Sequence, residues 1–328
     1  MRKHLSIGMI ALIGTLVGSL AGFPGAAAAQ DWPAKAPIRV IVTNTPGSAL
    51  DITARVVFDQ VSRQIGQTIV VENRPGAANT IGIAAVAKAE PDGYTILATT
   101  SGIAIAPHTH KTLSYDTVRD LRAVIPLGNL TNVMLTPAGR FKSLKDFIAA
   151  AKAKPDALTY ASIGPGSTGH LSAERLGLSA GFKALHVPFK GSPEAAREIA
   201  AGRVDFFFTP VAPALGLVRE NKVEALVVSS SSRSSLLPDV PTTTQAGFSN
   251  SNYDFWIGVF VPSATPPAIV DRLYGETRKA LALPEIKDRL GKLGAEPMVM
   301  SRDQFEAYFK KEIELNAKLV QAANILPQ

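Results

Sequence analysis

The chain has 328 residues and no cysteine, which excludes disulfides, thiolate nucleophiles and zinc sites built on cysteine. Its formal net charge is +7, but the basic residues are scattered, so the sequence does not indicate a nucleic-acid partner. A mild positive field favours anionic solutes, although a solvated basic surface explains the same charge.

The first 29 residues have the layout of a secretory signal peptide. Arg2 and Lys3 precede an apolar run from Leu5 to Leu20, and small residues follow as far as Ala29. We expect cleavage after Ala29 and a periplasmic mature protein. A retained membrane anchor is the weaker alternative, because glycines interrupt the run and no basic stop-transfer cluster follows it.

From residue 37 onward, short runs rich in β-branched residues alternate with helical periodicity. The runs predict strands at 38–43, 68–72, 94–99, 158–161, 204–209, 225–229 and 256–261. One helical face is predicted between the first two strands and another near the end of the chain, on Ala54, Val57, Phe58, Val61 and Ile65, and on Phe305, Tyr308, Phe309 and Ile313. Alternation of this kind predicts an α/β fold with largely parallel sheets.

Two polar, turn-rich points suggest that the chain passes between two lobes. They are Gly128-Asn129 and residues 247–252. We therefore expect residues 30–128 to begin lobe 1, residues 129–252 to form lobe 2, and residues 253–328 to return to lobe 1. Two crossings make a hinge, and the cleft between such lobes is the natural ligand site.

A glycine-rich turn at 164–169, with the sequence GPGSTG, follows one predicted strand and precedes a helix. It matches the G-x-G-x-x-G pattern of dinucleotide sites, which also require an acidic residue about 20 positions later. The region from Lys183 to Lys190 contains only lysines and His186 as ionisable groups. The sequence therefore argues against a dinucleotide cofactor.

Ser167 and His170, in and just after this turn, suggest a hydrolase. The nucleophile pattern G-x-S-x-G is absent, however, because Pro165 stands two residues before Ser167. Ser167 is better explained as the N-cap of the next helix. The exposed N–H groups of such a helix start, together with the helix dipole, form an anion site without any charged side chain.

A second turn, Pro46-Gly47-Ser48-Ala49-Leu50-Asp51, has the same design. Ser48 and Asp51 have the spacing of a capping box, and for Asp51 a purely structural role and a ligand-binding role are both open. Facing one another across a cleft, the two helix starts could hold the two ends of a small dianion.

Two further motifs have simpler explanations. Arg74 could pair with a ligand carboxylate, but an ion pair with a neighbouring side chain is the commoner role of such an arginine. His108 and His110 have a spacing seen in some metal sites, yet no acidic residue lies beside them before Asp116. We therefore expect two loop histidines and no metal site.

Nine motifs in order resemble the Bug family, the substrate-binding receptors of tripartite tricarboxylate transporters. They are "WPAKAPIRVIV", "PGSALD", "VENRPGA", "AKAEPDGYTIL", "LSYDTVRDL", "LTYASIGPGSTGHL", "HVPFKGS", "LPDVPTTTQAG" and "LGAEP". The resemblance spans nearly the whole mature chain. It implies a periplasmic binding protein of type II, a monomer whose two lobes close over a small carboxylate held by backbone N–H groups and waters.

The resemblance also places ligand-binding positions in this sequence, with no catalytic residue, cofactor or metal. They are Asn44, Pro46, Gly47, Ser48, Asp51, Ser101, Gly102, Ser162, Gly164, Gly166, Ser167, His170, Thr209 and Pro210. The sequence departs from the family pattern at Asn44, at Ser48, where a glycine is usual, and at Thr209, where an aspartate is frequent. These departures bear on which ligand is bound.

We therefore expect an extracytoplasmic receptor that captures a di- or tricarboxylate, an acidic amino acid or an aromatic acid. Its partner would be the membrane permease of a tripartite tricarboxylate transporter, and no nucleic acid. Two alternatives remain at this point. One is a solute sensor for a signalling system, and the other is an exported α/β hydrolase.

Overall fold

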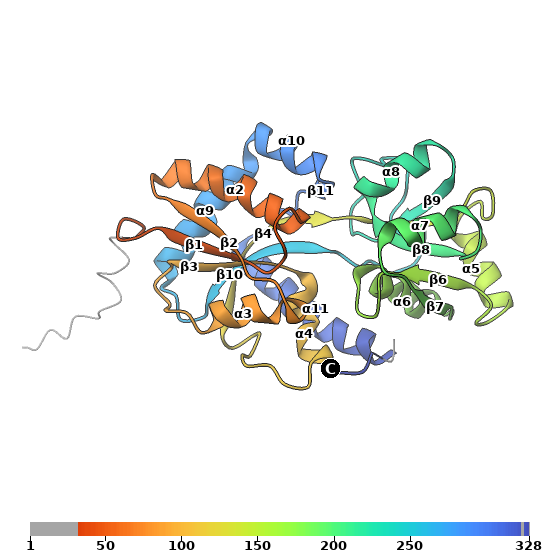
Figure 1. Ribbon diagram of the computed structural model, residues 1–328, viewed down its shortest axis with the longest axis horizontal. Coiled ribbons are helices and arrows are strands. Elements are labelled where there is room, and N and C mark those ends of the chain that lie inside the picture. The colour runs from red at the N-terminus through yellow and green to blue at the C-terminus, as the bar shows by residue number, and fades with distance from the viewer. Residues whose placement is uncertain (1–31, 323–324, 328) are drawn as a thin grey trace, which may run out of the picture.

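The computed structural model describes residues 32–322 and 325–327, so the predicted signal peptide lies outside the described residues. Two separate sheets form two lobes that lie side by side in Figure 1. The first sheet, in the order β11-β4-β10-β3-β1-β2, contains β1 (Ile38–Val42), β2 (Ile69–Asn73), β3 (Thr95–Thr100), β4 (Leu121–Leu130), β10 (Trp256–Pro262) and β11 (Ala295–Glu296). The second, in the order β7-β6-β8-β5-β9, contains β5 (Asn132–Pro137), β6 (Thr159–Ser162), β7 (Leu185–Pro188), β8 (Phe206–Pro210) and β9 (Val223–Val228).

Helices cover the faces of both sheets. Lobe 1 carries α2 (Ala49–Ile65), α3 (Thr80–Ala87), α4 (Ala106–Thr109), α9 (Pro267–Ala282), α10 (Pro284–Lys292) and α11 (Arg302–Ala322), with short 3₁₀ turns η1 (Ala77–Asn79) and η2 (Ser101–Ala104). Lobe 2 carries α5 (Leu144–Ala153), α6 (Thr168–Ala180), α7 (Ser192–Ala200) and α8 (Val211–Arg219). None of the described helices combines the length and apolarity that crossing a membrane requires.

Both helical faces predicted from periodicity are confirmed. On α2, Ala54, Val57, Phe58 and Val61 are buried in the core of lobe 1. On α11, Phe305 and Phe309 pack edge-on against Trp256, which is fully buried. These contacts stabilise both helices, because most of the stability of a helix in a protein comes from packing of its apolar face.

The prediction of largely parallel sheets is wrong. β1 pairs in parallel with β2 and β3, and β6 with β7 and β8, but β10 is antiparallel to β3 and β4, and β5 is antiparallel to β8 and β9. Parallel neighbours require a crossover helix. β5 and β10 arrive from the other lobe and insert into the middle of their sheets in the opposite direction.

The predicted turn at Gly128-Asn129 is also wrong. Both residues lie within β4 and pair with Ile257 and Trp256 of β10. β4 ends at Leu130 and β5 begins at Asn132, so one extended segment leaves the first sheet and enters the second. The return path through 247–252 is a turn, as expected, and residues 253–255 lead from it into β10.

Candidate functional site

Two six-residue segments with the pattern P-G-S-x-x-D or P-G-S-x-x-H occupy equivalent places in the two lobes. Residues 46–51 follow β1 and begin α2, and residues 165–170 follow β6 and begin α6. The backbone angle φ is +79° at Gly47 and +76° at Gly166, a left-handed conformation that favours glycine. Ser48 and Ser167 have nearly identical angles, with φ of −69° and −66° and ψ of 159° in both.

The hydrogen bonds of the two segments also correspond. Ser48 Oγ accepts a bond from Asp51 N at 3.2 Å, and Asp51 Oδ2 accepts one from Gly47 N at 2.9 Å. Ser167 Oγ accepts from His170 N at 3.4 Å. Serine therefore caps both helices, as predicted, but Asp51 reaches back to Gly47 and not to Ser48 itself.

In lobe 2 an imidazole takes the place of the carboxylate. His170 Nδ1 accepts a hydrogen bond from Gly166 N at 3.0 Å. Each turn is thus closed by one side chain three positions after the cap. In both helices the N–H groups of the first two residues, 49–50 and 168–169, have no intrahelical acceptor and can bind an anion.

Asp51 is 3 % exposed, and neighbouring residues donate hydrogen bonds to both of its carboxylate oxygens. Its Oδ1 accepts bonds of 2.9 Å from Arg55 Nε and from Asn73 Nδ2, whose amide also donates to Asn44 O. Burial raises the pKa of Asp51, but the bonds from Gly47 and Asn73 and the charge of Arg55 outweigh it and hold the pKa below its ordinary value. These contacts account for Asp51 as the residue that shapes the turn.

His170 is the buried end of a stack of aromatic rings. It is 4 % exposed and lies parallel to His186, with ring centres 4.2 Å apart, and His186 stacks on Tyr160 at 4.9 Å. Burial, with a smaller effect of His186, lowers the pKa of His170 to about 4. The ring is therefore neutral near pH 7 and can accept the hydrogen bond from Gly166.

These bonds argue against the hydrolase alternative. Ser167 Oγ is bonded to the backbone N–H of His170 and not to its ring, and the Nδ1 of the ring is bonded to Gly166. A nucleophilic serine needs a general base within hydrogen-bond reach of its hydroxyl. Ser167 is a helix cap.

Ser162 orders the start of the same turn. Its Oγ accepts from Gly164 N at 2.9 Å and lies 2.6 Å from His186 Nε2. Sequence reasoning missed His186 because it lies on β7, and only the pairing of β7 with β6 brings it beneath the turn.

The remaining predicted positions lie at or just after the carboxyl ends of strands. Ser101 and Gly102 begin η2 after β3, and Ser101 is 2 % exposed. Thr209 is buried near the end of β8, and Pro210 is the residue before α8. Asn79 was not predicted from the sequence. Its backbone is left-handed, and its Nδ2 lies 3.5 Å from Thr100 Oγ1, beside Ser101.

The charged motifs have the simpler roles. Arg74 Nε pairs with Glu72 Oε1 at 2.6 Å, as the ion-pair alternative predicted. His108 lies in α4 and not in a loop, and its Nε2 is 2.9 Å from Ile313 O. Within residues 32–322 and 325–327, no group of three or more histidine, aspartate or glutamate side chains could hold a metal ion.

Comparison with known proteins identifies the family of this chain. Residues 53–325 match the family described as "Tripartite tricarboxylate transporter family receptor". The chain belongs to this family. It is 36% identical over 286 residues to a UPF0065 protein from the tcbD-tcbE intergenic region of Pseudomonas sp. strain P51, covering 87% of this chain and 85% of the relative.

Two solved structures with bound solutes are similar over most of the chain. One is Rpa4515 of R. palustris with adipate, with 30% identity and a TM-score of 0.72, covering 91% of this chain and 100% of that one. The other is MatC of Rhodopseudomonas palustris with bound malate, with 29% identity and a TM-score of 0.67, covering 88% and 99%. The two lobes are thus those of a periplasmic binding protein, and the family consists of solute-binding receptors and not of enzymes.

Proposed function

We propose that this receptor captures a small carboxylate between its two Pro-Gly-Ser turns and delivers it to the membrane permease of a tripartite tricarboxylate transporter. The observation that carries the proposal is the matched pair of capped helix starts, one from each lobe. The proposed ligand-binding positions are those expected from the sequence, Asn44, Pro46, Gly47, Ser48, Asp51, Ser101, Gly102, Ser162, Gly164, Gly166, Ser167, His170, Thr209 and Pro210.

The charge of these positions suits a ligand held by the backbone. Asp51 and His170 are the two titratable groups among them, and both are used within their own turns. Each helix start carries about half a positive charge, which favours a carboxylate. Two such starts suit the two ends of a short dicarboxylate, and adipate and malate, bound by the similar receptors, are both of this kind.

Calorimetric titration of the chain from Gln30 onward with adipate and with malate tests the ligand class. We expect one of these acids to bind and its diamide not to bind, because an uncharged amide gains little from the helix starts. A ligand at a hundred times its dissociation constant should also stabilise the protein by about 2.7 kcal/mol. Equal binding of acid and diamide would contradict a site built for anions.

A matched cap substitution locates the site. Ser48→Ala and Ser167→Ala remove the caps of the two proposed turns, while Ser143→Ala removes the equivalent cap of α5, whose Oγ accepts from Asp146 N at 3.1 Å. Each substitution should destabilise the protein by about 1 kcal/mol. Affinity should fall in the first two variants only. A similar affinity in all three would place the ligand elsewhere.

Delivery to a permease and periplasmic location have separate tests. Protein recovered from periplasmic extracts should begin at Gln30, and a start at Met1 in the membrane fraction would support the anchor alternative. Crosslinking in membranes that contain the permease should capture the ligand-loaded receptor more than the empty one. Capture of a sensor domain instead would favour the signalling alternative.

A further inference from the structure

A cavity of about 270 Å³ lies in lobe 1 between the ends of α9 and α10, residues 125–127 of β4 and the loop 297–300. Figure 1 shows α10 at the top of this lobe, with α9 and β4 below it. The cavity shares no residue with the turns of the proposed carboxylate site. It is therefore a separate feature that the proposed function does not use.

The walls of the cavity are mostly apolar. Leu127, from β4, and Leu290, from α10, form its buried side. Met298 and Met300, from the loop, supply flexible side chains that adapt to an irregular apolar ligand. Between them Val299 is 88 % exposed, so this loop adds an apolar side chain on the solvent side.

Two cations are the charged groups of this lining. Arg278, near the end of α9, and Lys287, on α10, both line the cavity, and no carboxylate does. Neither takes part in any ion pair formed by the described residues. An apolar cavity with two unpaired cations suits an amphiphilic anion, because the apolar part can be buried while the charge stays with the cations.

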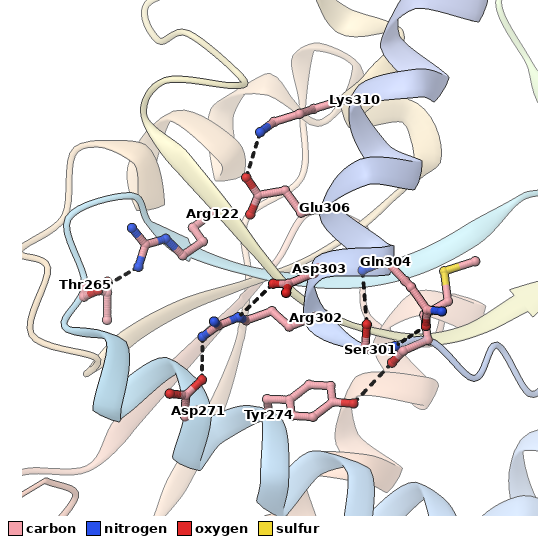
Figure 2. A network of polar contacts seen from close by, with 11 residues as sticks. Arg122, Thr265, Asp271, Tyr274, Ser301, Arg302, Asp303, Gln304, Glu306 and Lys310 are labelled. Carbon is pink, nitrogen blue, oxygen red and sulfur yellow. Dashed lines mark hydrogen bonds and ion pairs between the residues drawn. The ribbon is translucent and has the colours of Figure 1, made fainter.

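The loop wall is held in place by polar contacts drawn in Figure 2. Tyr274, on α9, donates a hydrogen bond of 3.3 Å to the carbonyl of Met300. Ser301 and Gln304 exchange bonds of 2.8 and 3.2 Å at the start of α11, and Arg302 pairs with Asp271 of α9. A wall fixed before binding lowers the entropic cost of binding a ligand.

From these features we infer that this cavity is a second ligand site, which binds a medium-chain aliphatic monocarboxylate. The aliphatic chain occupies the apolar cavity, and the carboxylate lies beside Arg278 and Lys287. The volume of about 270 Å³ equals that of roughly nine water molecules at ~30 Å³ each. Because a methylene group is about as large as a water molecule, this volume suits a chain of about eight to ten carbons.

The test is a calorimetric titration of the chain from Gln30 onward with decanoate, kept below the concentration at which it forms micelles. We expect one decanoate per protein molecule. Ala282→Trp, which fills the cavity from the end of α9, and Lys287→Glu, which reverses the charge at the carboxylate, should each weaken binding at least tenfold. Arg289→Glu is the matched control, because Arg289 is exposed on the same helix but does not line the cavity.

Three results would overturn the inference. The first is that the wild-type protein shows no saturable binding of decanoate. Binding of an acidic peptide to this face in place of decanoate would count as the same result. The second is that Arg289→Glu weakens binding as much as Lys287→Glu, which indicates general attraction to a basic surface. The third is that Ser167→Ala abolishes decanoate binding while Ala282→Trp does not, which places decanoate in the carboxylate site.

Discussion

Lowering the pH from 7.5 to 5 should destabilise the protein through His170. A histidine whose pKa is lowered by folding contributes stability that is fully present above its unfolded pKa of 6.5. That stability is lost as the pH falls through 6.5 toward the folded value of about 4. At pH 5 the unfolded chain binds the proton and the folded chain does not, which costs about 2 kcal/mol at 1.36 kcal/mol per pKa unit.

The loss has a structural cause in the lobe 2 turn. A proton on Nδ1 abolishes the hydrogen bond from Gly166 and places a charge in a buried stack against His186. His170→Asn keeps an acceptor near the position of Nδ1 but does not titrate. The variant should therefore lose less stability on acidification than the wild-type protein.

Urea denaturation at pH 7.5, 6 and 5 measures this difference. Two other groups around the ring also titrate, since burial lowers the pKa of His186 and raises that of Glu174. Comparing the two proteins at each pH largely removes these shared contributions. The wild-type protein should lose about 2 kcal/mol more than His170→Asn between pH 7.5 and 5. Equal losses in the two proteins would refute the assignment of the buried, neutral imidazole to the turn.

Two further predictions concern stability. Arg175 of α6 and Glu312 of α11 form a buried ion pair of 3.6 Å between the lobes. Arg175→Met should cost about 3–5 kcal/mol in urea denaturation, whereas the double variant Arg175→Met/Glu312→Leu should recover most of it; no recovery would show that the cost is not an unpaired charge. Gly258→Ala should lower the melting temperature, because a Cβ there would lie 2.6 Å from Phe305, and overpacking costs about 1–3 kcal/mol. Gly275→Ala, where a Cβ on α9 meets open space, should raise the melting temperature, because alanine stabilises a helix by about 0.5–1 kcal/mol relative to glycine. A higher melting temperature for Gly258→Ala than for Gly275→Ala would contradict the packing argument.

The elements predicted correctly from sequence are those with a local cause. β-branched runs predicted β1, β3 and β10 within one or two residues, and periodicity predicted α2 and α11. β4 was missed because it contains Pro126, Gly128 and Asn129, which normally interrupt strands. The structure accommodates them where the register with β10 shifts, and such irregularities depend on a partner strand more than 120 residues away.

In the candidate site, too, the features with a local cause could be predicted from the sequence and those that depend on strand pairing could not. Serine caps depend on neighbours three residues away, so both turns could be predicted from their sequences. The partners that complete them could not, because Asn73 reaches Asp51 through the pairing of β1 with β2, and His186 reaches His170 through the pairing of β6 with β7. Local sequence patterns do not reveal the order of the strands within a sheet.

The two lobes repeat one topological plan, which explains why the two turns match. In each sheet the first of three parallel strands, β1 or β6, lies between the other two, β2 and β3 or β7 and β8. A strand arriving from the other lobe, β10 or β5, pairs with the third of them. The helix after that first strand therefore starts at the same place in each lobe, and the same Pro-Gly-Ser cap forms there. The two turns differ in the group that closes them. A carboxylate whose pKa is held below its ordinary value closes the turn of lobe 1, and an imidazole with a pKa near 4 closes that of lobe 2. The lobe 2 turn should therefore open first as the pH falls to about 4. A ligand that bridges the two turns should then be released on the lobe 2 side before the lobe 1 side.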